Sequence, residues 1–168
     1  MMHTLIRPAA CADLPRLTEI YNHYVLTSPV TFDLEPLTVE QRAGWFQEHA
    51  NTGRHRLLVA DEGELVLGYA STSRFRDRAA YDTTVETSIY CAPEAVGSGI
   101  GSALYRELFA AIAGEDINRV VAGITLPNDA SVALHRSFGF VQVGVFSQTG
   151  RKFDRYWDVA WFERPLAR

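Results

Sequence analysis

Residues 86–105 constrain the fold more than any other part of the chain. An alternating segment that carries the carboxylate of Glu86 is followed by a turn with glycines at 97, 99 and 101, and then by a helix with an apolar stripe. Backbone N–H groups converge where a glycine-rich turn opens a helix, and the helix dipole adds partial positive charge there. The segment therefore predicts a site for a phosphate-bearing cofactor beside an acidic side chain.

The position of this glycine turn excludes two common nucleotide sites. A Walker loop needs a Gly-Lys-Ser/Thr ending, which the segment lacks. A Rossmann fingerprint follows an early strand, whereas this turn lies in mid-chain. A turn that is merely tight would leave three glycines beside a well-formed helix start unexplained, so we favour a different kind of phosphate site.

Composition limits the classes of partner. The chain has 168 residues, a formal net charge of -4 and a pI near 5.7, so we expect one domain over residues 1–168 and no nucleic-acid or membrane partner. Cys11 and Cys91 form neither a disulfide framework nor a zinc-ligand spacing, which predicts no metal and a reducing compartment. Residues 1–10 lack the apolar core of a signal peptide, and no segment has the length of a membrane span. These observations predict a cytoplasmic protein.

The periodicity of apolar residues predicts an α/β domain with a mixed sheet. Asp13 and Asp129 stand where they would cap helices, and residues 38–41 have the capping-box pattern. Gly150 lies between the last two expected strands. We expect strands at residues 4–7, 56–60, 65–71, 84–91, 119–126, 141–146 and 156–162, and helices at 14–25, after 38, from 100, and at 129–138.

A second segment, residues 128–140, runs from Asn128 through a short helix to a Gly-Phe ending. Together with the glycine turn, it resembles the GNAT superfamily of N-acetyltransferases over nearly the whole chain. The resemblance implies a mixed, largely antiparallel central sheet flanked by helices, and acetyl-CoA as the co-substrate. In that family an Arg/Gln-x-x-Gly-x-Gly motif holds the pyrophosphate; here Val96 occupies the Arg/Gln position, so we expect binding mainly through backbone N–H groups.

A narrower resemblance, to the phosphinothricin acetyltransferase subfamily, rests on several short motifs in order. They lie at residues 21–25, 31–32, 80–82, 85–90, 126–129, 134–135, 150–152 and 157–159. This resemblance implies direct transfer of an acetyl group, in a ternary complex, to the amine of a small amino acid or analogue such as phosphinothricin or methionine sulfoximine. It also implies a homodimer.

Two residues are the expected catalytic groups. Glu86 is placed to accept the proton of the acceptor amine, directly or through one water. Without its context, a strand glutamate would more often face solvent or join an ion pair. His135 falls where many superfamily members place a residue near the leaving sulfur, so it is a general acid, a second base or a structural residue.

The cofactor is expected to contact the end of the strand, the turn and the short helix. The resemblance assigns it Ile89, Tyr90, Cys91, Gly97, Ser98, Gly99, Ile100, Gly101, Ser102 and Asn128. The backbone from Ile89 to Cys91 would also supply a donor to the developing oxyanion if the strand splays or bulges there.

The expected acceptor pocket combines cations and aromatic rings. Arg74, Arg76 and Lys152 are candidates to bind an acceptor carboxylate, because guanidinium groups bind carboxylates in a bidentate manner. Phe32 and Tyr81 are candidate walls. The alternative for the arginines is a solvated basic loop.

Three rival functions remain open at this stage. One is acetylation of a protein N-terminus, which needs an open groove. Another is acetylation of a polyamine, which needs an acidic pocket and fits poorly with Arg74 and Arg76. The third is a non-catalytic acyl-CoA sensor, which would have no need for Glu86 and His135.

Overall fold

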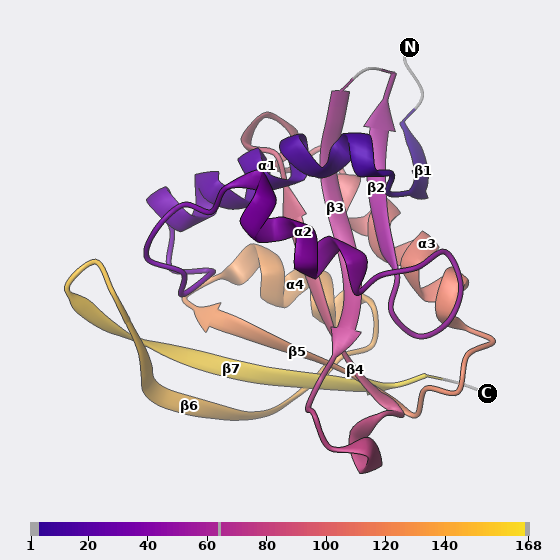
Figure 1. Cartoon of the computed structure of the whole chain (residues 1–168). Helices are drawn as coiled ribbons and strands as arrows, with labels where there is room; N and C mark the ends of the chain where they lie inside the picture. The colour runs from indigo at the N-terminus through magenta and orange to yellow at the C-terminus, as the bar shows by residue number, and fades with distance from the viewer. Residues whose placement is uncertain (1–3, 64, 167–168) are drawn as a thin grey trace.

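A seven-stranded sheet of order β1-β2-β3-β4-β5-β7-β6 crosses the molecule in the computed structural model (Figure 1), which describes residues 4–63 and 65–166. The strands are β1 Leu5–Pro8, β2 Leu57–Glu62, β3 Leu65–Arg74, β4 Thr84–Cys91, β5 Arg119–Leu126, β6 Val141–Lys152 and β7 Arg155–Pro165. Only β4 and β5 pair in parallel among the described strands, so the predicted mixed, largely antiparallel sheet is confirmed. Residues 1–3, 64 and 167–168 of the expected domain, including the start of the segment considered as a signal peptide, lie outside the described residues.

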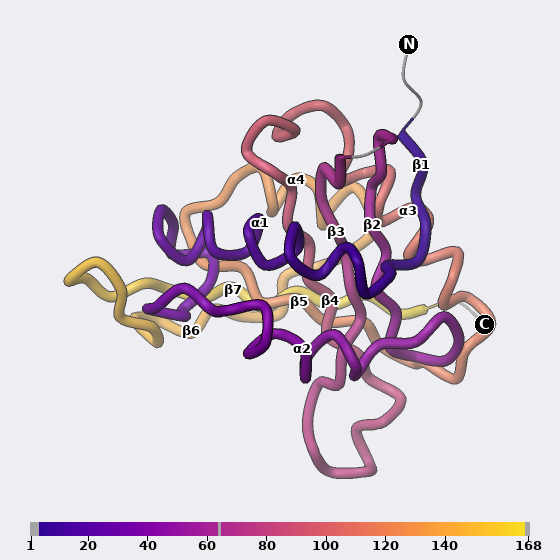
Figure 2. The backbone as a smooth tube through the Cα atoms, turned by 45° about the horizontal axis from the view of Figure 1, so that its top comes forward, coloured from indigo at the N-terminus to yellow at the C-terminus, as the bar shows by residue number. Residues whose placement is uncertain are grey.

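Four helices cover the two faces of this sheet. They are α1 Leu14–Thr27, α2 Val39–Gln47, α3 Ile100–Ile112 and α4 Asp129–Ser137. Helices α1 and α2 lie on one face, and α3 and α4 lie on the other (Figures 1 and 2). The stripe on α3 is buried as its 3.6-residue period predicts, with Leu104, Leu108 and Ile112 fully inaccessible, so the sheet and α3 share one apolar core.

Strands β4 and β5 separate after a short paired stretch. Their parallel pairing covers only residues 84–86 and 119–121. Beyond Glu86, β4 stays in continuous register with β3 on its other side, up to the pair of Gly68 and Cys91. The strands therefore splay without a bulge in the β3–β4 register, and residues 87–91 present an open backbone edge toward β5.

The helix caps differ from the sequence prediction at two places. Asp13 stands at the N-cap of α1, but its carboxylate accepts from the backbone N–H of Ala10 and pairs with Arg7. Asn128, and not Asp129, caps α4, because its side chain accepts from the N–H of Ser131. The predicted capping box of α2 at residues 38–41 is confirmed.

The last hairpin is longer than predicted. Strand β6 extends to Lys152, and β7 begins at Arg155. Gly150 therefore lies inside β6 and not in the connection. Phe153 and Asp154 form the two-residue turn, with φ of 52° and 55°. Positive φ at both positions is the geometry of a type I′ turn, but neither residue is glycine, so the usual hairpin signal is absent.

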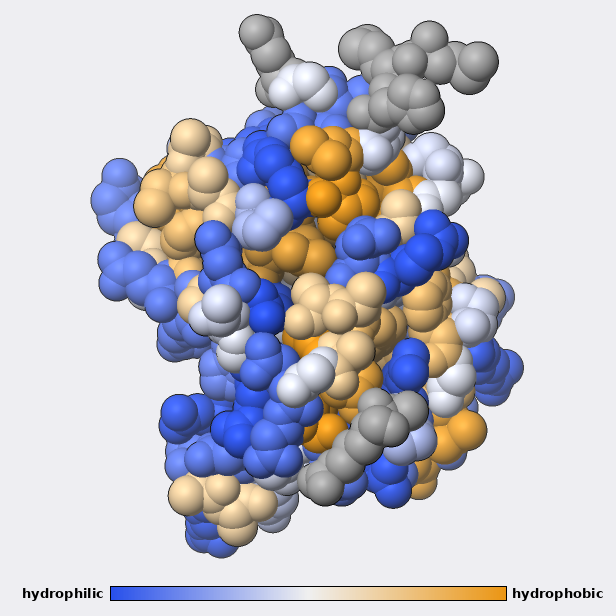
Figure 3. Space-filling model, turned by 90° about the vertical axis from the view of Figure 1, so that its right-hand side faces the viewer, coloured by the Kyte–Doolittle hydropathy of each residue, from blue (hydrophilic) through white to orange (hydrophobic). Residues whose placement is uncertain are grey.

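The surface of the molecule mixes hydrophilic and hydrophobic residues. The face in Figure 3 is a mosaic of both kinds, without one extended field of either. Within the described ranges, no helix has the length and apolar character needed to cross a membrane.

Candidate active site

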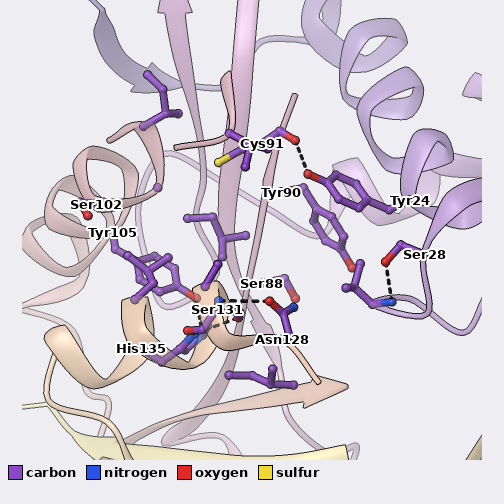
Figure 4. A pocket seen from close by; sticks show the side chains of 18 of the residues that line it. Tyr24, Ser28, Ser88, Tyr90, Cys91, Ser102, Tyr105, Asn128, Ser131 and His135 are labelled. Carbon is purple, nitrogen blue, oxygen red and sulfur yellow. Dashed lines mark hydrogen bonds between the residues drawn. The ribbon is translucent and has the colours of Figure 1, made fainter. Parts of the chain in front are cut away.

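A cavity of about 630 Å³ occupies the gap where β4 and β5 splay (Figure 4). Its walls come from the end of β4, the start of α3, the second half of β5 and the first turns of α4. The expected cofactor residues in its lining are Ile89, Tyr90, Cys91, Gly97, Gly99, Ile100, Gly101, Ser102 and Asn128, and His135 lines it as well. The cavity thus brings together residues separated by more than forty positions in sequence.

The glycine turn forms one end of this cavity. Gly97 and Gly99 have φ of 82° and 89°, a conformation that side chains disfavour. Gly99 is the N-cap of α3 and supplies no side-chain cap, so the first N–H groups of α3 keep donor capacity for a ligand. Gly101 lines the cavity and also permits close packing, because a Cβ there would lie 3.3 Å from Leu134 of α4.

Two neighbours in the turn behave differently from the glycines. Ser98 donates both its N–H and its hydroxyl to the carbonyl of Ala95, and it is absent from the cavity lining. Its side chain therefore stabilises the turn. Val96 lines the cavity and is 63% exposed, so an apolar side chain occupies the place that the family motif gives to a polar one.

The backbone edge of β4 forms the wall opposite α4. The carbonyl of Cys91 accepts a 2.6 Å hydrogen bond from the hydroxyl of Tyr24 in α1 (Figure 4). The N–H of the next residue, Ala92, bonds back to Leu67, so the alternation of a strand directs the peptide groups of Ile89 and Cys91 toward the gap. Burial raises the pKa of the Cys91 thiol, which disfavours the thiolate and a nucleophilic role.

His135 lies at the floor of the cavity with both ring nitrogens in hydrogen bonds. Nε2 lies 2.9 Å from the Tyr105 hydroxyl, and Nδ1 lies 2.8 Å from the carbonyl of Ser131 (Figure 4). A carbonyl only accepts, so Nδ1 carries the proton and Nε2 accepts from Tyr105. The residue is 3% exposed, and burial lowers the pKa of its imidazole, which favours this neutral form.

Glu86 lies at the point where the strands separate. Its side chain is half-buried, and burial raises its pKa, while the positive charge of Arg76 acts in the opposite direction. Its register partner is Ser73, so Glu86 shares a face of the sheet with Ser88 and Tyr90, the face that α1 and α2 cover. A carboxyl with a raised pKa is a stronger proton acceptor once ionised.

A second cavity, of about 300 Å³, adjoins the first on the α1 and α2 face. Ser88 and Tyr90 line both cavities, so the two meet across the open end of β4. The other lining residues are Tyr21, Asp33, Leu37, Gln41, Arg42, Trp45, Tyr69, Ser71 and Ser73. The volume suits a molecule of amino-acid size.

The structure does not bring the predicted acceptor residues together. Arg74 pairs with Val85, so it lies on the sheet face opposite to Glu86, where it lines a third cavity with His55. Arg76 is exposed in the loop after β3, where its guanidinium stacks on Phe75. Tyr81 is 42% exposed and also packs edge-on against Phe75. Of these residues, only Arg76 acts electrostatically on Glu86.

Phe32 and Lys152 join the loop after α1 to the last hairpin. Lys152 is only 3% exposed, and its Nζ donates to the carbonyl of Thr31 at 2.8 Å. The Phe32 ring packs so closely on Gly150 that a Cβ there would overlap it. Neither residue lines the two cavities, so their observed contacts position the loop that carries Asp33.

Of the residues that line the second cavity, sequence reasoning placed only Tyr90 in a site, as a cofactor contact. Arg42 and Trp45 lie three positions apart and therefore on one side of α2, and Tyr21 faces them from α1. The three-residue spacing of an arginine and a tryptophan on α2 was the available signal. This spacing does not indicate which face of the sheet α2 covers. No cluster of His, Cys, Asp or Glu suited to a metal ion occurs within residues 4–63 and 65–166.

The splayed strands, the glycine turn at a helix start and the adjoining carboxylate define an acyl-CoA-dependent transferase site. The sequence profile of the acetyltransferase (GNAT) family matches residues 17–140, and the chain belongs to this family. It is therefore an N-acetyltransferase that uses acetyl-CoA. The residues that line the first cavity fit this co-substrate, because they offer helix N–H groups at one end and an open strand edge along its length.

Relatives with defined names match over nearly the full chain. A phosphinothricin N-acetyltransferase of Streptomyces coelicolor is 53% identical over 96% of this chain and 95% of its own length. A methionine sulfoximine/methionine sulfone acetyltransferase of Pseudomonas aeruginosa is 34% identical over 98% of this chain and 96% of its own. The structure of a Sinorhizobium meliloti phosphinothricin acetyltransferase in complex with acetyl-CoA superposes with a TM-score of 0.92, at 39% identity, covering 99% of this chain and 90% of that chain.

Proposed function

We propose that this enzyme acetylates the α-amine of a small amino acid or amino acid analogue, of the phosphinothricin or methionine sulfoximine type. The observation that carries the proposal is the junction of two cavities at Ser88 and Tyr90. The larger cavity has the features of an acetyl-CoA site, and the smaller one, of about 300 Å³, has room for an amino-acid-sized molecule beside it. The names of the relatives support the same class of acceptor.

Direct transfer follows from this arrangement. The acceptor enters as an ammonium ion and loses a proton to Glu86, through a water where the distance requires one. The amine then attacks the thioester carbon, the carbon–sulfur bond breaks, and coenzyme A leaves as a thiolate. The second proton of the amide nitrogen passes to solvent, the thiolate takes a proton from solvent, and Glu86 returns its proton to solvent before the next turnover. The N–H of Ile89, on the open edge of β4, is the proposed donor to the developing oxyanion. The proposed cofactor contacts are Ile89, Tyr90, Cys91, Gly97, residues 99–102 and Asn128. Ser98, also expected as a contact, would act indirectly by stabilising the turn.

An assay of coenzyme A release tests the proposal. We expect turnover with L-phosphinothricin, L-methionine sulfoximine or L-methionine sulfone, and much weaker turnover with spermidine or with a peptide N-terminus. The second cavity encloses only about 300 Å³, which is small for a polypeptide in an open groove. Tight binding of acetyl-CoA without turnover of any amine would favour an acyl-CoA sensor instead.

We further propose that the enzyme is a homodimer that associates through β6. This strand is the edge of the sheet, and its apolar side chains are exposed: Val141 by 60%, Val143 by 57% and Phe146 by 57%. Exposed apolar edge strands are ready association surfaces.

We also propose a cytoplasmic location, where acetyl-CoA is available and free cysteines stay reduced.

Sedimentation analysis of a charge-insertion variant tests the dimer. We expect the wild type to sediment as a dimer at micromolar concentration and Val143→Glu to sediment as a monomer. Leu5→Glu is the matched control, because Leu5 is 60% exposed on β1 at the opposite edge of the sheet. A monomeric wild type, or equal dissociation by both variants, would count against association through β6.

A further inference from the structure

A buried arginine that forms no ion pair within residues 4–63 and 65–166 lies in the second cavity. Arg42 of α2 is 5% exposed, and its guanidinium carbon lies 3.9 Å from the centre of the Trp45 ring and 4.3 Å from that of Tyr21. Its one recorded hydrogen bond runs from Nη2 to the Tyr69 hydroxyl at 3.5 Å, and Nε has no partner within the described residues.

This environment leaves most of the binding capacity of the guanidinium unused. Arginine carries five N–H donors in a planar fork, and a buried charge is costly unless it is paired. The faces of Trp45 and Tyr21 compensate part of that cost, but they accept nothing in the plane of the fork. The acid in the same cavity, Asp33, accepts from the Tyr21 hydroxyl, and no ion pair within 4 Å joins it to Arg42.

The rest of the cavity fits a compact anion with a polar neighbour. Ser71, Ser73 and Ser88 offer hydroxyl groups along the sheet, and Ser88 also lines the larger cavity. A molecule whose anionic oxygens rest on Arg42 therefore extends along β4 toward the site of acetyl transfer. Glu86 lies on this same sheet face, two residues from Ser88 along β4, where an amine would need its base.

We infer that Arg42 binds the α-carboxylate of the acceptor and that the aromatic rings of Tyr21 and Trp45 hold its guanidinium fork in place. The inference rests on the proposed function, since it assigns the acceptor's acid group to the second cavity. It replaces Arg74 with Arg42 as the acceptor's carboxylate ligand. A side-chain oxyanion, such as a phosphinate, offers the same chemistry to a guanidinium, so the test separates the two.

Steady-state kinetics with a matched pair of acceptors provides the first arm of the test. L-Methionine sulfone carries only the α-carboxylate as an anion, and its carboxamide carries none. We expect Arg42→Gln to raise the KM of the sulfone by about 100-fold, to leave the KM of acetyl-CoA within about twofold, and to leave the carboxamide unaffected. Arg42→Lys keeps the charge but loses the planar fork of donors. Its KM for the sulfone should lie between the values of the wild type and Arg42→Gln.

Arg54→Gln is the control for loss of a partly buried arginine, because Arg54 pairs with Asp116 away from both cavities. It should leave all three KM values unchanged. Equal losses with the sulfone and its carboxamide in Arg42→Gln would overturn the inference, because they would indicate a packing role. Selective loss with phosphinothricin but not with the sulfone would assign Arg42 to a side-chain oxyanion and would also overturn it.

Direct binding separates this inference from the proposed function. The indole N–H signal of Trp45, assigned with Trp45→Phe, should shift on titration of the enzyme with L-methionine sulfone and should not shift in Arg42→Gln. The same shift without turnover of any amine would uphold the anion site while the proposed function fails. Turnover of the sulfone with no response at Trp45, at saturating sulfone, would place the carboxylate elsewhere. Circular dichroism of each variant verifies that the fold is retained.

Discussion

Replacement of Glu86 by glutamine is expected to lower kcat by about 10²–10⁴-fold, the range that a general base contributes. Glutamine keeps the shape of the side chain but cannot accept the proton of the amine. The KM of acetyl-CoA should change by less than about twofold, because Glu86 is not part of the lining of the larger cavity. Stopped assays of coenzyme A release under saturating acceptor give both constants.

The pH dependence of kcat/KM tests the role of Glu86 as the general base independently. Burial raises the pKa of Glu86 above its usual value of 4.5, in spite of the opposing charge of Arg76. A base with a raised pKa is protonated, and so inactive, at a higher pH than an exposed glutamate. Activity should therefore fall as the pH drops through that raised pKa, and this acid limb should be absent from the residual activity of Glu86→Gln.

A glutamate on another strand serves as the control for these measurements. Glu62 is half-buried at the end of β2, outside the two adjoining cavities. Glu62→Gln should retain full activity and the full acid limb. A rate for Glu86→Gln that equals the wild-type rate at pH 7 would remove Glu86 from the mechanism.

The part of the cofactor site formed by β4, the glycine turn and α3 was predictable because these elements are adjacent in the sequence. Strand β4, the glycine turn and the start of α3 follow one another, so alternation, glycine spacing and helical period fix their geometry without knowledge of the sheet order. The observed bounds of β4 and β5 are those that the sequence predicts. The splay of these strands was not predictable, because it depends on where pairing stops in three dimensions.

The acceptor side depends on contacts between distant elements. Strand β3 was expected to end at Ser71, but it continues to Arg74. Those added residues alternate between faces, so Ser73 joins Glu86 and Arg74 turns away from it. Arg42 lies thirty residues earlier, on a helix whose docking face only the fold reveals. Single-sequence reasoning had no means to join these residues.

Removal of the imidazole of His135 is expected to cost stability more than catalysis. His135→Ala would delete the side chain of a residue that is 3% exposed and would remove the Nε2 acceptor of the buried Tyr105 hydroxyl. A cavity and a lost buried hydrogen bond together destabilise by about 2–5 kcal/mol. Because Nδ1 and Nε2 are both engaged, His135 positions Tyr105 in our interpretation, and kcat of the folded variant should fall by no more than about tenfold.

The dependence of stability on pH distinguishes this role from proton donation. Burial lowers the pKa of His135 from 6.5, so below that pH the unfolded chain binds a proton that the folded chain does not. The wild type therefore loses stability as the pH falls below about 6.5, and His135→Ala lacks this part of the loss. Burial also lowers the pKa values of His49 and His55, and their contributions to the loss of stability at low pH remain in the variant. The difference in free energy of unfolding between wild type and variant should thus narrow from pH 8 to pH 5 in urea titrations. A loss of kcat above about 100-fold at unchanged stability would instead identify His135 as a proton donor.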